Sequence, residues 1–135
     1  MAEVRFRRKI IIYQPAAVGS DETQPVMTVK KGWRVIGCMV TPLINSAGTT
    51  NSTFTLGDDT DPDGYVTSAT IDLEAAVVGT WIDGIGAYLL ETTAAVSKYG
   101  HLYLVDDTID VVYTANTAGA TNPRVKIVID YIPLA

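Results

Sequence analysis

Apolar and polar residues alternate along most of the chain, and the alternation is clearest close to its C-terminus. Within residues 123–132, PRVKIVIDYI, an apolar side chain occupies every second position and charged side chains lie between them. A strand places successive side chains on opposite faces, so this segment is predicted to be a half-buried strand. Its expected inner face is Val125, Ile127, Ile129 and Tyr131, and its expected outer face carries Arg124, Lys126 and Asp130.

Similar short runs of β-branched and aromatic residues recur along the chain, separated by Gly, Pro, Asn and Asp. Regular short strands with turn residues between them predict an all-β fold, a single-domain antiparallel β-sandwich or jelly roll. The expected strands are 4–13, 26–30, 33–43, 51–57, 65–72, 86–92, 100–105, 109–115 and 123–132.

Two connections carry more specific signals. Lys31 and Gly32 lie between the second and third expected strands, and because glycine takes positive φ at little cost, we predict a hairpin there, after which Trp33 opens a central strand. Residues 73–81, LEAAVVGTW, are the only helix candidate, and we expect at most one short helix.

The length of 135 residues fits one domain that can bury a core without disulfides. Cys38 is the only cysteine, and its apolar neighbours predict a buried thiol. We divide the chain into an N-terminal arm or edge strand with its loop, residues 1–24, and a β-sandwich, residues 25–135. The apolar run at residues 10–13 is too short for a signal peptide or a membrane span. We therefore expect synthesis in the cytoplasm and no membrane partner.

Basic residues are concentrated at the N-terminus, although the whole chain has a formal net charge of −5. An acidic chain argues against direct nucleic-acid binding. The basic N-terminal segment is interpreted either as a docking arm for an acidic neighbouring subunit or as a solvated edge strand whose charges prevent edge-to-edge pairing. The candidate contact residues are Arg5, Arg7, Arg8 and Lys9.

Residues 54–66, FTLGDDTDPDGYV, hold the densest group of carboxylates. Asp59, Asp61 and Asp63 with Gly64 repeat the start of a calcium loop, in which alternate carboxylates converge on one cation. The twelfth position is Thr70 instead of glutamate, and strands instead of helices flank the loop. The alternative is a solvated turn whose aspartates accept backbone N–H groups.

No catalytic signature emerges. His101, the lone histidine, and Cys38 could in principle form a nucleophile and base, but an apolar strand is a poor setting for a reactive thiol. Asp106, Asp107 and Asp110 are interpreted as a polar strand connection. The sequence therefore predicts a non-enzymatic protein without a cofactor.

An ordered set of phrases carries a family resemblance: TLGDDTDPDGYV, ATIDLEAAVVGT, GAYLL, KYG, IDVVYTANTAG and a final RVKIVIDYI. In this order they resemble small head proteins of tailed bacteriophages, of the kind that decorates or cements the capsid. The resemblance covers roughly residues 33–132 and leaves the N-terminal segment outside it.

The resemblance implies a virion protein that is assembled in the host cytoplasm and stabilises the capsid from its outer surface. The implied partners are the major capsid protein and further copies of this chain, as a homotrimer between capsomers. A head spike, a tail part or a host-surface or carbohydrate-binding module is the alternative, with Trp33, Trp81 and Tyr88 as stacking candidates. We expect at least two of these three rings to be largely buried, because each lies in or beside an apolar run.

Overall fold

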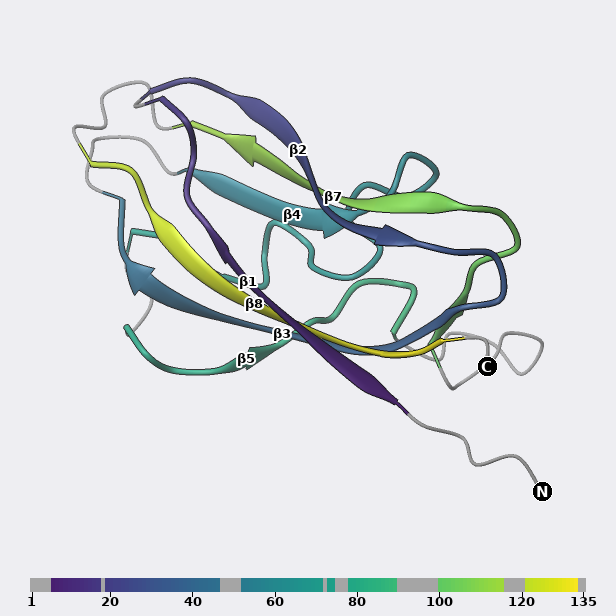
Figure 1. Ribbon diagram of the computed structural model, residues 1–135. Helices are drawn as coiled ribbons and strands as arrows, with labels where there is room; N and C mark the ends of the chain where they lie inside the picture. Colours follow the sequence, from purple (N-terminus) through teal and green to yellow (C-terminus); the bar gives the residue numbers. More distant parts are fainter. Residues whose placement is uncertain are drawn as a thin grey trace.

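In the computed structural model, two antiparallel sheets lie face to face, as Figure 1 shows. The structure describes residues 6–17, 19–46, 52–71, 73–74, 78–89, 100–115 and 121–133. The strands are β1 (Arg7–Tyr13), β2 (Glu22–Val29), β3 (Arg34–Ile44), β4 (Thr53–Gly57), β5 (Ile82–Asp83), β6 (His101–Leu102), β7 (Asp107–Thr114) and β8 (Arg124–Ile132). The predicted all-β single-domain sandwich is therefore confirmed.

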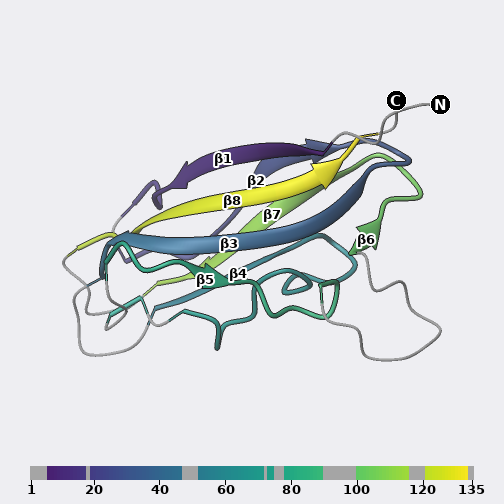
Figure 2. The same ribbon diagram turned by 90° about the horizontal axis from the view of Figure 1, so that it is seen from below.

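The larger sheet has the order β1-β8-β3-β5, with β6 also paired to β3, and the smaller sheet has the order β2-β7-β4. Both views show β1 and β2 on the same side of the sandwich, each as the last strand of its sheet (Figures 1 and 2). The central position predicted for the strand after Trp33 is confirmed, because β3 lies between β8 and β5.

The core fills the space between the two sheets. Its fully buried side chains come from both layers, and in β8 they follow the predicted alternation, with Val125, Ile127 and Ile129 inside. Across the core lie Phe54 and Leu56 of β4. Cys38 is also buried, as its apolar neighbours predict.

The predicted hairpin at Lys31 and Gly32 is wrong. Gly32 does adopt a positive φ of 90°, but β2 pairs with β7 and β3 pairs with β8, so the turn carries the chain from one sheet to the other. Asp106, in the connection between β6 and β7, holds this crossing: its carboxylate accepts the Lys31 backbone N–H at 2.9 Å and lies 3.7 Å from the Lys30 ammonium.

Two predicted strands also fail in the described residues. Residues 65–71 form turns apart from a single bridge between Leu56 and Val66, and residues 86–89 form a turn, while residues 72 and 90–92 lie outside the described residues. The apolar side chains of the first segment are nevertheless buried, including Tyr65 and Val66. Their burial explains the strand-like pattern, because a loop packed on a core also hides its apolar residues.

No helix forms within the described residues, and none there is long and apolar enough to cross a membrane. Of the helix candidate, residues 73–74 and 78–79 lie in turns, and residues 75–77 are outside the described part. The boundary proposed at residue 24 falls within β2, and β1 is hydrogen-bonded along its whole length to β8.

Candidate functional site

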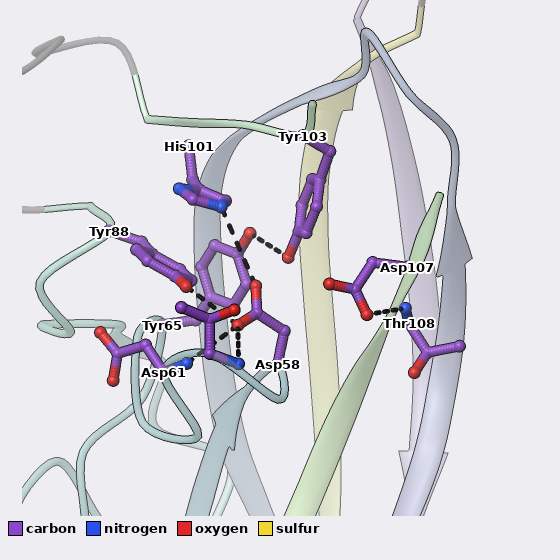
Figure 3. Close-up of polar contacts among 9 residues, drawn as sticks. Asp58, Asp61, Tyr65, Tyr88, His101, Tyr103, Asp107 and Thr108 are labelled. Carbon is purple, nitrogen blue, oxygen red and sulfur yellow. Dashed lines mark hydrogen bonds and ion pairs between the residues drawn. The ribbon is translucent and has the colours of Figure 1, made fainter. Parts of the chain in front are cut away.

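A buried carboxylate organises the loop after β4. Asp58 is only 3% exposed, and its Oδ1 accepts the backbone N–H groups of Thr60 and Asp61, both at 3.0 Å. The Tyr88 hydroxyl donates to the same oxygen at 2.9 Å (Figure 3). Three donors satisfy a carboxylate that would otherwise be costly to bury. Asp58 is thus the structural centre of the acidic loop.

Aromatic rings surround Asp58 and complete what we call the aromatic cluster: Asp58, Tyr65, Tyr88, His101 and Tyr103. The His101 ring stacks on Tyr88 with 3.6 Å between ring centroids, and its Nε2 lies 3.9 Å from Asp58 Oδ2. The Tyr65 and Tyr103 hydroxyls, both on buried rings, are hydrogen-bonded at 2.7 Å. Figure 3 shows these side chains converging from the loop after β4, the 86–89 turn and residues 101–103.

Close backbone packing reinforces the aromatic cluster. Gly86 donates its N–H to the Tyr65 carbonyl at 3.0 Å, and Tyr88 donates to the Gly64 carbonyl at 2.8 Å. A Cβ on Gly86 would collide with the backbone of Gly64, so a side chain there would force the two segments apart. The cluster therefore joins segments distant in sequence into one end of the sandwich.

The electrostatics of the aromatic cluster reflect burial. Burial lowers the pKa of His101 below 6.5, although Asp58 opposes this shift. Burial and the bond to Asp58 raise the pKa of Tyr88, so the phenol stays protonated and keeps donating. At neutral pH the cluster is a fixed hydrogen-bonded assembly in which the imidazole of His101 is neutral.

The predicted calcium ligands occupy the rim of the same loop. Asp59 and Asp63 are exposed and Asp61 is half-buried. Burial and the neighbouring Asp63 raise the pKa of Asp61. Among the described residues, no group of three His, Cys, Asp or Glu side chains is placed to hold a metal ion. Calcium binding by this loop stays a prediction.

The two groups considered for thiol chemistry have separate surroundings. Burial raises the pKa of Cys38 to about 12, so the thiol is protonated at neutral pH and a poor nucleophile. The carboxylate that faces His101 is Asp58. This arrangement can stabilise a loop, but it does not activate a nucleophile.

The predicted contact residues lie on β1, apart from Arg5, which is outside the described residues. Arg8 is engaged within the chain, because its guanidinium contacts both oxygens of Asp130 on β8, at 2.8 and 3.1 Å. Arg7 and Lys9 are exposed and alternate with Arg8, so they point to the other side of the strand.

A groove, the edge groove, runs between β1 and β2. One part has a volume of about 520 Å³ and is lined by Lys9, residues 25–28 and Thr108. The adjoining part has a volume of about 280 Å³ and is lined by residues 11–14 and 24–26. Both parts are lined by Pro25 and Val26, so they adjoin on the side of the sandwich where β1 and β2 are the last strands of their sheets.

Sequence reasoning missed Asp58, Tyr65 and Tyr103 as members of one cluster. A usable signal exists: Asp58 directly follows β4, and an aspartate that opens a turn accepts the N–H groups two and three residues on. The counting pattern for calcium starts instead at Asp59, which is why the buried acid was overlooked. The pairing of Tyr65 with Tyr103, 38 residues away, has no local signal.

Comparison with solved structures finds this fold in two capsids. A chain of the cyanophage Pam1 capsid asymmetric unit matches with a TM-score of 0.61 and 14% identity, over 97% of this chain and 85% of that one. A chain of the acid-stable capsid structure of Helicobacter pylori bacteriophage KHP30 matches with a TM-score of 0.52 and 6% identity, over 95% and 93%. Identities this low show a shared fold. No family model matches the chain, and neither does any curated protein.

Proposed function

We propose that this chain is a non-enzymatic structural protein of a tailed-phage virion that decorates and cements the capsid. One observation carries the proposal: this chain shares its fold, over most of its own length and of theirs, with chains from two phage capsids. Because the match covers 85% and 93% of those chains, they are chains of about this size and not large subunits that merely contain such a module.

The chemistry of the chain supports a structural role. A cement protein needs a rigid body and contact surfaces, and no reacting groups. Cys38 is a buried protonated thiol, and His101 is stacked within the aromatic cluster. The thiol is thus part of the core, and the imidazole lies against the loop after β4.

We further propose that the chain works as a homotrimer on the outer surface of the capsid, between capsomers, after assembly in the host cytoplasm. Exposed apolar side chains on β1 support an assembled state, because Ile10 and Ile12 are 55% and 61% exposed and lie on the same face. Three linked footprints would bind the shell more tightly than one. Arg5, Arg7, Arg8 and Lys9 remain the proposed contact residues, with Arg8 the least available because of its pairing with Asp130.

The first test is quantitative mass spectrometry of purified virions from the source phage, counting this chain relative to the major capsid protein. Hundreds of copies per particle are expected for a cement protein. A handful of copies would identify a spike, connector or tail part, and absence from the virion would refute the proposal. Native mass spectrometry of the purified protein tests the trimer separately.

A carbohydrate- or host-surface-binding module is the second candidate, and one observation favours it. Trp81 is 46% exposed, with the Lys126 ammonium 5.9 Å from its ring centroid. Trp33 and Tyr88 are partly buried against the core, which leaves one open ring for stacking on a sugar. Binding on a glycan array that is lost in Trp81→Ala would support this candidate, and an array without binding would count against it.

A further inference from the structure

Two strand edges border the edge groove. Among the described residues, β1 is paired only with β8, and β2 only with β7. Within the part of the chain that the structure describes, no other segment makes backbone hydrogen bonds to residues 7–13 or 22–29. A strand edge offers alternating N–H and C=O groups that bind an added strand readily. The groove therefore has the backbone chemistry to accept an extended segment.

The two edges are not equivalent. The register of β1 on β8 is unbroken from Arg7, opposite Tyr131, to Tyr13, opposite Val125. The register of β2 shifts between Pro25 and Met27, and proline has no N–H to donate. β1 is therefore the edge that can hydrogen-bond an added strand over its full length of seven residues, while β2 forms the opposite wall.

The side chains along the edge groove define what it would accept. Lys9 lines the larger part, and Arg7 shares its face of the strand, so this end is positive. Further along, Ile11 and Val26 are packed against the core and line the smaller part. An extended segment with carboxylates at one end and an apolar side chain further along would match both ends.

A second copy of the same strand is a poor occupant. A parallel pair of β1 strands would place Arg7 and Lys9 directly opposite the same residues of the second copy, and like charges directly opposite are destabilising. An antiparallel pair over the full strand would place Arg7 opposite Tyr13 and Lys9 opposite Ile11, where neither cation meets a carboxylate. The basic residues thus act selectively: they disfavour self-pairing and favour an acidic strand from a different protein.

We propose that the edge groove captures an extended acidic segment of the capsid shell protein by strand addition to β1. This inference rests on the proposed function, because it names the partner and its mode of attachment. The chain's own β1 is the acceptor, so residues 7–13 receive the shell segment as part of the sandwich.

Photo-crosslinking tests the location. A photoreactive amino acid replaces Thr28 or Gln24 in the groove. As a control, it replaces Asp83 on β5, which lies at the opposite edge of the larger sheet from β1. Each variant is bound to source-phage shells produced without this chain. We expect cross-links from the two groove positions to a single acidic shell segment, and none to that segment from position 83. If the protein binds shells but the groove positions give no such cross-link, or cross-link to a second copy, the inference fails and the proposed function stands. If the protein does not bind shells, both fail.

A matched pair of charge reversals tests the chemistry. Lys9→Glu and Lys31→Glu change the net charge equally, but Lys31 lies in the connection between β2 and β3, outside the groove lining. Lys9→Glu is expected to weaken binding to shells on the order of tenfold, and Lys31→Glu to leave it within about twofold. Equal losses would show long-range attraction without a groove contact and would overturn the inference, as would binding that is unchanged in both.

Discussion

The aromatic cluster and the edge groove are opposite solutions to the problem of polar groups on a β-sandwich. In the cluster, the Asp58 carboxylate is buried and accepts three donors. At the groove, the outer edges of β1 and β2 have no backbone partner among the described residues. The comparison separates stability from recognition. Substitutions in the aromatic cluster should alter the free energy of unfolding, and substitutions at the edge groove should alter binding.

The largest effect is expected from removing the buried carboxylate. Asp58→Ala leaves two backbone N–H groups and the Tyr88 hydroxyl without their acceptor, and hydrogen bonds to a charged group contribute roughly 1.5–3 kcal/mol each. Since such losses overlap, we expect the free energy of unfolding to fall by about 3–4 kcal/mol, measured by urea denaturation.

Asp59→Ala is the matched control, because Asp59 is the adjacent residue and is exposed. Its effect should stay within about 0.5 kcal/mol, as for most surface substitutions. Equal losses in the two variants would mean that the loop depends on its total charge, and the central role of Asp58 would be refuted.

The next effect concerns the buried hydroxyl pair. Tyr65→Phe keeps the ring in the core but removes the 2.7 Å bond to the Tyr103 hydroxyl, which should cost about 1–1.5 kcal/mol of unfolding free energy. Tyr131→Phe is the control, since Tyr131 is also an aromatic residue but stacks on Trp33 near the surface. A double-mutant cycle of Tyr65→Phe with Tyr103→Phe would give a coupling energy near zero if the two hydroxyls acted independently.

The loop and the sheets also differ in how far the sequence predicts them. Strand β8 follows its alternation pattern at Val125, Ile127 and Ile129, which face the core, although Val128 on the other face is also buried. Tyr65 and Val66 are just as buried, but their backbone is held by a loop bridge to Leu56, which apolar periodicity does not distinguish from a strand. The sequence thus predicts which residues are buried, but it does not predict which segment their backbone pairs with.

The failed hairpin and the edge groove teach the same lesson about pairing. Lys31 and Gly32 predict a tight turn, and Gly32 has the positive φ that such a turn requires. Which sheet β3 joins depends on β8, about ninety residues later in the chain. The basic residues of β1 were recognised in the sequence, but the groove needs β2 beside β1, and nothing local encodes that neighbour.

Acid should weaken the aromatic cluster through His101. Burial holds the folded-state pKa of His101 below 6.5, so when the pH falls through 6.5 the unfolded chain binds a proton more readily than the folded chain. The stability contributed by the neutral imidazole is therefore present above pH 6.5 and lost as the pH falls below it. Urea denaturation between pH 7.5 and 5 measures this loss.

The control for this loss is His101→Phe, which keeps an aromatic ring beside Tyr88 but cannot titrate. Asp61 and Asp110 have raised pKa values and act in the opposite direction at lower pH, and the comparison of the two proteins cancels their contribution. A variant whose stability depends on pH as steeply as the original protein would refute the role of His101.

The smallest effect on the free energy of unfolding is expected for the basic residues of β1 beside the edge groove. Arg7→Ala and Lys9→Ala remove exposed side chains of an edge strand, so each should change the free energy of unfolding by less than about 0.5 kcal/mol. Arg8→Ala breaks a two-point contact with Asp130 and should lower the free energy of unfolding more than either of these changes. The same three proteins should rank differently in binding to phage shells, with Lys9→Ala weakened and Arg8→Ala nearly unchanged. If the three variants lost shell binding in the same order as they lost stability, the same contacts would serve folding and binding. The division of roles between the aromatic cluster and the edge groove would then be wrong.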